Sequence, residues 1–282
     1  FEGGLPMGRL LNCTTFVAIF FCMSLATGHA SDLDSFMGLS GTLNIAGGTA
    51  HIKCETEAIK RIMRAYPDVN ITIAGGGSGV GIKQVCEGLI DIGNTGREPT
   101  PEEISRCNLK VHKFAVDGIG VVVNPKLNID NISNENLKKV FAGDITNWKN
   151  LAGSEGSINV YTRDAESGTR KVFWSKGLAK GKIAEQANFV QSNAAMKTAI
   201  ANDPQGIGYI SLGVADSSVK LLAIDGIFPS NDNVKTGKYE IARGLYMNTR
   251  GEPDPLAKAF ISYMLNPEGQ ALVKQHGFLP VQ

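Results

Sequence analysis

The sequence has few of the residues on which metal and catalytic sites commonly depend, and neither sign of charge is in large excess. Of 282 residues, four are histidine and five are cysteine, and no Cys-x-x-Cys or metal-ligand spacing of histidine is present. A structural zinc site is therefore not expected. The 28 Lys and Arg residues nearly balance 27 Asp and Glu residues, which gives no electrostatic reason to bind nucleic acid or an anionic membrane.

No apolar run is long enough to span a bilayer comfortably. The apolar stretch Phe16 to Leu25 follows the basic start Met7 to Arg9, and Gly28 to Ala30 places small residues before a cleavage point. This pattern predicts upstream residues plus a secretory signal peptide over residues 1–30, with cleavage near Ala30-Ser31. An uncleaved N-terminal anchor is the alternative.

What is present is a globular composition, with 43% hydrophobic residues and 33 glycines, which indicates many tight turns. Strands and helices are predicted to alternate: strands at 43–46, 69–73 and 90–92, and helices at 50–66, 79–89 and from 100 onward. This rhythm predicts an α/β fold with a parallel sheet and helices on both faces. Ligands of such sheets bind at the carboxyl ends of the strands.

A second block of alternating elements follows Pro125. Strands are predicted at 158–162, 206–210 and 239–248, and helices at 134–142, 169–176, 194–202, 255–265 and 267–276. Pro125 and the segment near Leu221 are the predicted crossings between two lobes. Lobe I would comprise residues 39–124 and 222–282, and lobe II residues 125–221.

Three cysteines follow the predicted cleavage point: Cys54, Cys86 and Cys107. The helices that carry Cys86 and Cys107 follow consecutive strands, and right-handed crossovers running in one direction place them on one face of the sheet. The helix that carries Cys54 is expected on the opposite face. We therefore predict a disulfide between Cys86 and Cys107, with Cys54 free.

Three loops rich in Gly, Ser and Thr connect predicted strand ends to helix starts. They are Gly47 to Ala50, Gly75 to Gly79, and Arg163 to Thr169. A helix start has unpaired N–H groups and a partial positive charge, so glycines and hydroxyls there admit an anion. Three such loops with an arginine indicate a site that surrounds a small oxyanion.

Each of these loops also has an ordinary structural interpretation. Ser167 can be a plain N-cap beside a surface arginine, and the second loop can be a glycine-rich turn. The second loop does not match G-x-G-x-x-G, the P-loop or the G-x-S-x-G elbow. Arg97 either faces the same site or pairs with Glu98 or Glu102. Asp117 is a carboxylate in an apolar run and needs a partner there, which is either a protonated ligand or a turn.

In this order along the chain, the motifs resemble the phosphate-binding proteins of bacterial phosphate ABC importers. The resemblance extends from about Gly41 to Val281. The segments that carry it are Ala74 to Ile82, Asp91 to Gly93 with Arg97, Asp117 to Ile119 with Asn124-Pro125, Phe141 to Gly143 with Asn147-Trp148, Arg163 to Thr169, Ile207 to Tyr209, and Asn266 to Gln270.

The resemblance implies a two-lobed periplasmic-binding-protein fold that closes over phosphate in the cleft between its lobes. It places the ligand on Thr49, Ala50, Ser78, Arg163, Ser167, Gly168 and Thr169. The sequence departs from the family pattern at Gly48 to His51, where Gly-Ser-Thr is usual, and at Gly96-Arg97, where Ser-Arg or an Asp is usual. With that hydroxyl or carboxylate missing, Asp117 is our candidate for the acceptor of the ligand's proton, and Arg97 stays a candidate ligand.

The predicted function is therefore an exported, periplasmic, monomeric solute-binding protein that captures inorganic phosphate and delivers it to the permease of an ABC importer. No cofactor, metal, catalytic residue or nucleic-acid partner is expected. One alternative is a binding protein for another oxyanion, such as sulfate, molybdate or tungstate. A second is a hydrolase with Ser78 or Ser167 as nucleophile, which needs a base within hydrogen-bond reach. A third is an anion-sensing partner of a signalling receptor.

Overall fold

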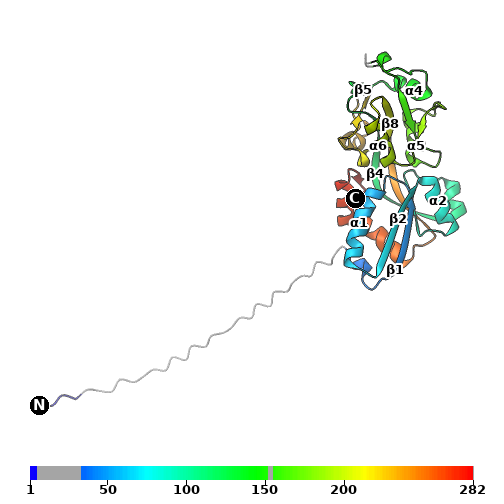
Figure 1. Ribbon diagram of the computed structural model, residues 1–282. Helices are drawn as coiled ribbons and strands as arrows, with labels where there is room; N and C mark the ends of the chain where they lie inside the picture. Colours follow the sequence, from blue (N-terminus) through cyan, green and yellow to red (C-terminus); the bar gives the residue numbers. More distant parts are fainter. Residues whose placement is uncertain (5–32, 152–154, 282) are drawn as a thin grey trace. The chain divides into compact units, whose positions relative to one another are not determined.

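The computed structural model describes residues 1–4, 33–151 and 155–281 of the chain (Figure 1). The predicted signal peptide and its cleavage point lie outside the described residues. Within the described ranges, no helix combines the length and the apolar character needed to cross a bilayer. The account below concerns the compact unit that begins at Asp32.

The described helices and strands follow the predicted alternation closely. The α-helices are α1 (Ile52–Ala65), α2 (Ser78–Glu87), α3 (Pro101–Cys107), α4 (Asn134–Ala142), α5 (Gly168–Val172), α6 (Asn193–Asn202), α7 (Asn231–Lys235), α8 (Pro255–Leu265) and α9 (Pro267–Gln275). The strands are β1 (Gly41–Gly47), β2 (Val69–Gly76), β3 (Ile92–Thr95), β4 (Leu109–Val123), β5 (Asn131–Ile132), β6 (Asn159–Thr162), β7 (Asn188–Phe189), β8 (Gly206–Ser211), β9 (Lys220–Leu221), β10 (Ala223–Ile224), β11 (Ala242–Arg250) and β12 (Leu279–Pro280). Short turns of helix are η1 (Asp34–Phe36), η2 (Trp148–Asn150), η3 (Phe173–Gly177) and η4 (Leu212–Val214).

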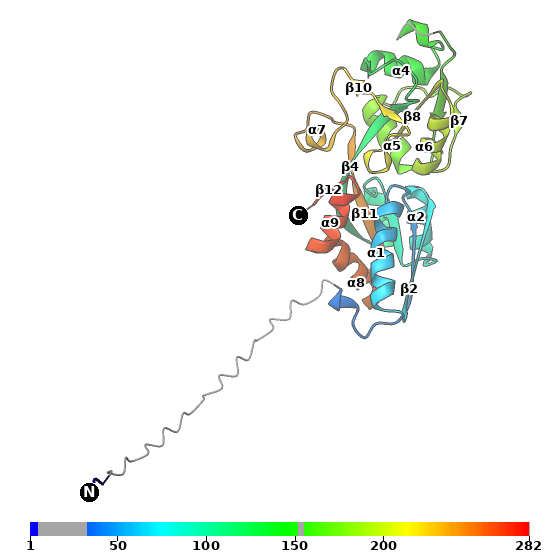
Figure 2. The same ribbon diagram turned by 60° about the vertical axis from the view of Figure 1, so that its left-hand side comes forward.

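One long strand, β4, belongs to both lobes. Residues 109–118 of β4 pair with β11, whereas residues 119–123 pair with β8. The sheet therefore continues from one lobe to the other in the order β2-β1-β3-β11-β4-β8-β6-β7. In Figure 2, β4 and β11 run between the lobe that contains α1, α2 and α8 and the lobe that contains α4, α5 and α6.

The sheet is mixed, and this refines the predicted parallel arrangement. Strand β1 is parallel to β2 and β3, and β6 is parallel to β7 and β8. Strand β11 is antiparallel to β3 and β4, and β4 is antiparallel to β8. The reason is topological: β4 carries the chain into lobe II and β11 carries it back, so these two neighbours run in opposite directions.

The two largest apolar cores place the boundary between the lobes inside these strands. Lobe I holds a core that includes Phe114, Ala115 and Leu245, and lobe II holds one that begins at Ile119 and includes Ile241. The chain thus changes lobe near residues 116–118 and again near 242–244, whereas the sequence analysis placed the crossings at Pro125 and near Leu221. Pro125 lies in an exposed turn and Leu221 in the short strand β9, which pairs with the lobe II part of β4, so neither position is a crossing between the lobes.

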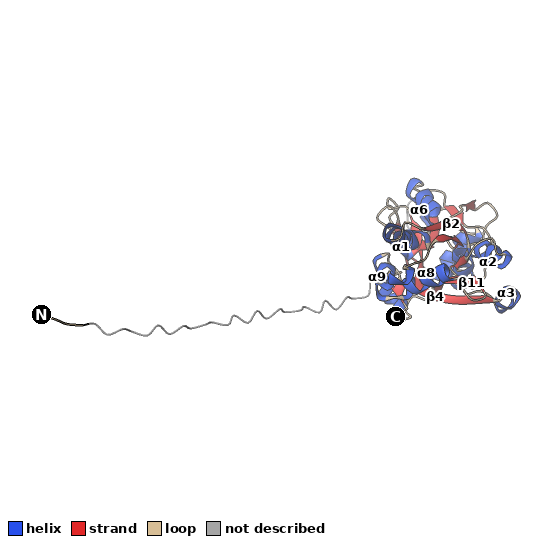
Figure 3. Ribbon diagram, turned by 90° about the horizontal axis from the view of Figure 1, so that it is seen from below, coloured by secondary structure: helices blue, strands red, loops and turns tan. Residues whose placement is uncertain are grey.

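Helices cover both faces of the lobe I sheet. Figure 3 shows α1, α8 and α9 on one side and α2 and α3 on the other. The first group packs on the large core around Ile62, Phe260 and Val273, and the second encloses a smaller core that contains Ile82, Val85 and Cys107. A capping box starts α3, because the Thr100 hydroxyl accepts a hydrogen bond from the Glu103 N–H group and the Glu103 carboxylate accepts one from the Thr100 N–H group.

The predicted disulfide is confirmed. Cys86 at the end of α2 bonds to Cys107 at the end of α3, and Cys54 in α1 is free and buried. The reasoning from crossover direction therefore held, because α2 and α3 do lie on one face and α1 on the other.

Removing this disulfide should lower stability without altering the ligand site. We expect the double variant Cys86→Ser, Cys107→Ser to lose about 3 kcal/mol of unfolding free energy, the value typical for a closed loop of this length. Urea unfolding of both proteins measures this difference. Thiol titration of the denatured, unreduced protein should find only Cys54 reactive among the cysteines after residue 30; three reactive thiols would contradict the disulfide.

Candidate functional site

A small cavity lies where the two lobes meet. Its volume is about 10 Å³, close to that of one water-sized sphere and far below the usual 300–1,000 Å³ of sites for organic ligands, so it does not suit an organic ligand. It is lined by Gly48, Thr49, Ala50, Gly77, Ser78 and Gly96 from lobe I, Ser167, Gly168, Thr169 and Arg163 from lobe II, and Arg243 from β11. All the predicted ligand residues except Arg97 and Asp117 are in this set.

The lobe I side consists of the loops that follow β1, β2 and β3. These strands are adjacent and parallel, so their carboxyl ends meet at one edge of the sheet. Thr49 precedes α1, Ser78 is the first residue of α2, and Gly96 follows β3. The Ser78 hydroxyl accepts a hydrogen bond of 2.9 Å from the Gly96 N–H group, which joins the second loop to the third strand.

The lobe II side is dominated by Arg163, which follows β6 and is 1% exposed. Its Nη2 donates to the Gln191 carbonyl at 2.9 Å, and its backbone N–H donates to the Tyr209 hydroxyl at 3.1 Å. Its Nε and Nη1 have no hydrogen-bond partner in the described part of the chain. Burial lowers the pKa of Arg163 from its ordinary value, and the nearby Arg243 lowers it further. A buried cation with two unpaired donors is costly unless an anion meets it.

Sequence reasoning missed two residues of the site, Arg243 and Asn193. Arg243 Nη1 donates to the Thr169 hydroxyl at 2.9 Å and to the Gly96 carbonyl at 3.0 Å. The Asn193 side chain donates to Thr49 at 3.1 Å and to Thr169 at 3.3 Å, and so joins the two lobes. A signal for Arg243 was present, because it is a charge within a strand that otherwise reads as buried. Nothing in the sequence marks Asn193 beyond its place at the start of a helix.

The structure does not support Asp117 as a proton acceptor for the ligand. Asp117 lies opposite Arg243 in the β4–β11 pairing. Its Oδ2 accepts from Arg243 Nε at 3.0 Å and Nη2 at 2.8 Å, and its Oδ1 accepts from the Ser211 hydroxyl at 2.8 Å. Asp117 therefore holds Arg243 in place and is not part of the cavity lining. The sequence showed that the buried carboxylate needed a partner but not which partner it had.

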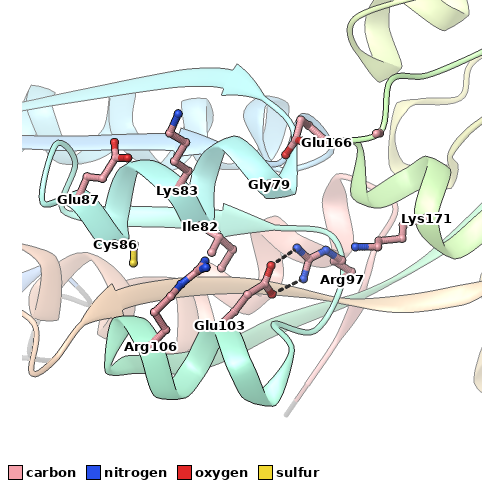
Figure 4. A pocket seen from close by; sticks show the side chains of 11 residues that line it. Gly79, Ile82, Lys83, Cys86, Glu87, Arg97, Glu103, Arg106, Glu166 and Lys171 are labelled. Atoms are coloured by element: carbon pink, nitrogen blue, oxygen red, sulfur yellow. Dashed lines mark hydrogen bonds and ion pairs between the residues drawn. The ribbon is translucent and has the colours of Figure 1, made fainter.

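Arg97 also lies elsewhere. Its guanidinium makes two hydrogen bonds to the Glu103 carboxylate, of 2.6 and 2.7 Å, drawn as dashed lines in Figure 4. The predicted structural alternative, pairing with an acidic residue, is thus the one found, although with Glu103 rather than Glu98 or Glu102. The groove in Figure 4 is a separate feature, lined by α2 and α3 of lobe I and by Glu166 and Lys171 of lobe II.

Glycines allow the lobes to approach closely around the cavity. A Cβ atom on Gly168 would lie 2.1 Å from the Ser78 hydroxyl and 3.1 Å from the Gly96 carbonyl oxygen. A Cβ atom on Gly77, whose φ is +95°, would lie 2.7 Å from the Glu166 carbonyl oxygen. Beside them, the Gly79 N–H donates to the Glu166 carbonyl at 3.0 Å across the lobes. The close contact between the lobes therefore requires glycine at positions 77 and 168, because a side chain at either position would collide with the opposite lobe.

Two ionisable residues are buried behind the first loop. Burial raises the pKa of Glu55 to about 8, opposed by its 2.6 Å hydrogen bond from Asn94. Burial also lowers the pKa of His51 to about 3, and its ring lies 5.3 Å from that of Phe114. Both groups are therefore uncharged in the folded protein at neutral pH, and their substitution leaves the charges of the cavity unchanged.

The raised pKa of Glu55 should make stability fall as pH rises. Between the ordinary value of 4.5 and about 8, the folded protein holds a proton at Glu55 that the unfolded chain has lost. The unfolding free energy should therefore fall by up to about 1.4 kcal/mol per pH unit in that window. His51 has the opposite effect, but only below its ordinary value of 6.5. Urea unfolding of ligand-free protein between about pH 6.5 and 8 therefore avoids the opposing effect of His51.

The control for this prediction is Glu55→Gln, which keeps the oxygen that Asn94 binds. The variant should show a flatter dependence of unfolding free energy on pH than the wild type. Parallel curves for the two proteins would show that Glu55 does not retain its proton in the folded state.

Comparisons with known proteins identify a family that covers most of the chain. A family model described as the PBP superfamily domain matches residues 37–268. The chain is 36% identical to the phosphate-binding protein PstS of Bacillus subtilis over 94% of this chain and 92% of that protein. It is 31% identical to the PstS protein of Borreliella burgdorferi over 85% of this chain and 90% of the relative.

Solved structures share the fold. A crystal structure from Clostridium perfringens with bound phosphate, of a candidate phosphate ABC transporter substrate-binding protein, superposes with a TM-score of 0.80 at 28% identity. The superposition covers 86% of this chain and all of the Clostridium perfringens chain. An ABC-type phosphate transport receptor of Vibrio cholerae gives a TM-score of 0.68 at 29% identity, with 85% of this chain and all of that chain covered. The chain therefore belongs to the PBP superfamily and, within it, to the PstS family of phosphate-binding proteins.

Proposed function

We propose that this protein binds inorganic phosphate in the cavity between its lobes and delivers it to the permease of an ABC importer. The observation that carries the proposal is Arg163, a buried cation at the small cavity between the lobes, whose Nε and Nη1 have no partner among the described residues. Four hydroxyls and the starts of α1, α2 and α5 surround the same space, and such groups suit a tetrahedral oxyanion.

The relatives support phosphate as the ion. The proteins of Bacillus subtilis and Borreliella burgdorferi are named for phosphate binding, and the Clostridium perfringens structure contains it. The transporter context of that structure supports a permease partner. A periplasmic location and a monomeric state complete the proposal, in line with the signal-peptide pattern of residues 1–30.

Binding rather than catalysis is the activity that we propose. The Ser167 hydroxyl accepts a hydrogen bond of 3.1 Å from the Arg170 N–H group, as an N-cap does, and Ser78 accepts from Gly96. A hydrolase would need a base beside one of these serines. The hydrogen bonds of the two serine hydroxyls in the described residues are instead to backbone N–H groups.

Calorimetry of ligand-stripped protein with phosphate, arsenate, sulfate and molybdate tests the proposal. Phosphate should bind, and at a hundred times its Kd it should add about 2.7 kcal/mol to the unfolding free energy. Binding of molybdate or sulfate without any binding of phosphate would refute the assignment of the ion. Retention of phosphate affinity in a variant without the Arg163 side chain would refute the assignment of the site.

A further inference from the structure

The side chains that line the cavity are rich in hydrogen-bond donors and contain no carboxylate. Six of the lining residues carry polar side chains: Thr49, Ser78, Ser167, Thr169, Arg163 and Arg243. Arginine is a donor only. A hydroxyl has one donor and two acceptor positions, so its role toward a ligand depends on which positions the protein already occupies.

The two threonines have both acceptor positions occupied. Thr49 accepts from the backbone N–H of Asn193 at 3.3 Å and from its side chain at 3.1 Å. Thr169 accepts from Arg243 at 2.9 Å and from the Asn193 side chain at 3.3 Å. Each threonine hydroxyl can then only donate its proton. Asn193 and Arg243 thereby fix the two threonines as donors toward the cavity.

The two serines each retain one acceptor position. Ser78 accepts from the Gly96 N–H, and Ser167 accepts from the Arg170 N–H. Either serine can accept a proton from a ligand hydroxyl, but only as a neutral acceptor.

None of the nearby carboxylates among the described residues lines the cavity. Both oxygens of Asp117 are occupied by Arg243 and Ser211. Glu166 lines the separate groove of Figure 4. Asp164 follows Arg163 in the chain but does not line the cavity, and its Oδ1 is buried without a described partner. Asp164 is therefore the carboxylate that a test must examine.

Given the proposed phosphate site, we infer that the cavity selects tetrahedral dianions with few protons: it binds monoprotonated phosphate in preference to diprotonated phosphate, and it also admits sulfate. Protonation of a phosphate oxygen turns that oxygen from a hydrogen-bond acceptor into a donor. Each P–OH group must then either face a donor of the protein or occupy the free acceptor position of Ser78 or Ser167. Diprotonated phosphate has two such groups and monoprotonated phosphate has one. Sulfate has none near neutral pH, and no carboxylate repels it.

The test measures the affinities of phosphate and sulfate for the same ligand-stripped protein between about pH 8 and pH 5.5. Phosphate affinity should fall about tenfold per pH unit below the second ionisation of phosphate, because the competent ionic form is diluted by that factor. Sulfate keeps its charge over this range and serves as the internal control, so the ratio of the two affinities should follow the ionisation of phosphate.

Two outcomes would overturn the inference. One is a ratio of affinities that does not change with pH. The other is sulfate binding weaker than that of phosphate by more than about a thousandfold at pH 8, the scale expected when an anion faces a buried carboxylate. In both cases the proposed phosphate function stands. If sulfate binds and phosphate does not at any pH, the proposed function fails and the donor-rich character of the site is supported.

Two variants identify the group responsible. Asp117→Asn should weaken both anions by a similar factor, because Asp117 acts only by positioning Arg243, and the ratio should keep its pH dependence. Asp164→Asn should leave the ratio unchanged. If Asp164→Asn instead improves sulfate relative to phosphate by tenfold or more, Asp164 is the acceptor of the ligand's proton and the inference is wrong. Thermal melting of each ligand-free variant verifies that it folds.

Discussion

Replacing Arg163 by alanine should weaken phosphate binding by roughly 2–5 kcal/mol, the usual loss when one member of a buried charged pair is removed. This corresponds to a Kd higher by between about thirtyfold and several thousandfold. The reason is that Arg163 is 1% exposed and keeps two donors unpaired at the cavity, so the ligand is its natural counter-ion. Calorimetry of wild type and variant measures the change.

The matched control is Arg97→Ala. Arg97 is a largely buried arginine as well, but it is already paired with Glu103 and lies outside the cavity. Its removal should change the Kd by less than about threefold, since a charge outside the site acts only through a screened field. Equal losses of affinity in the two variants would show that general electrostatics, rather than a direct contact of Arg163, controls binding.

Replacing Gly168 by alanine should weaken binding by about 1–3 kcal/mol, the typical cost of an added group in a packed region, which raises the Kd between about fivefold and 150-fold. Gly168 is the first residue of α5, where alanine is locally acceptable. The new methyl group would instead meet Ser78 and Gly96 of the opposite lobe. The loss of binding free energy should therefore come from a weaker contact between the lobes.

Two measurements separate this effect from a loss of stability. The unfolding free energy of the ligand-free variant should stay close to that of the wild type if its lobes can move apart, whereas its Kd for phosphate rises. Small-angle scattering with saturating phosphate should show a larger radius of gyration for the variant. A variant as compact as the wild type and with its affinity would show that the Gly168 methyl group is accommodated by a shift of Ser78 alone.

Local structure was largely predictable from sequence because local signals determine it. Residues 134–142 were predicted as a helix and form α4 with those limits. The strand predicted at 90–92 is shifted in the structure, since β3 begins at Ile92 and continues to Thr95. Residues 93–95 contain Gly, Asn and Thr and read as a loop, but the sheet pairs β3 with both β1 and β11, so tertiary pairing outweighed the local preference.

The predictions about single charged residues depended on partners distant in sequence. Arg163 was predicted to bind the ligand, and it lines the cavity together with Ser167 and Thr169, which are close to it in the chain and lie at one helix start. Asp117 was misjudged because its partner Arg243 is 126 residues away. Apolar context shows that a charge is buried, but it cannot show which opposite charge is buried beside it.

The sequence by itself determined the α/β class, the two blocks of elements, the Cys86–Cys107 pairing and the three loops that form the cavity. These follow from hydrophobic periodicity, capping residues and the handedness of crossovers, all of which act over short stretches of chain or fixed topology. Only the tertiary structure decided that β4 and β11 cross between the lobes, that Arg243 enters the cavity, and that Asn193 orients both threonines. Each of these depends on long-range strand pairing or on contact between lobes, where the deciding atoms belong to residues far apart in sequence.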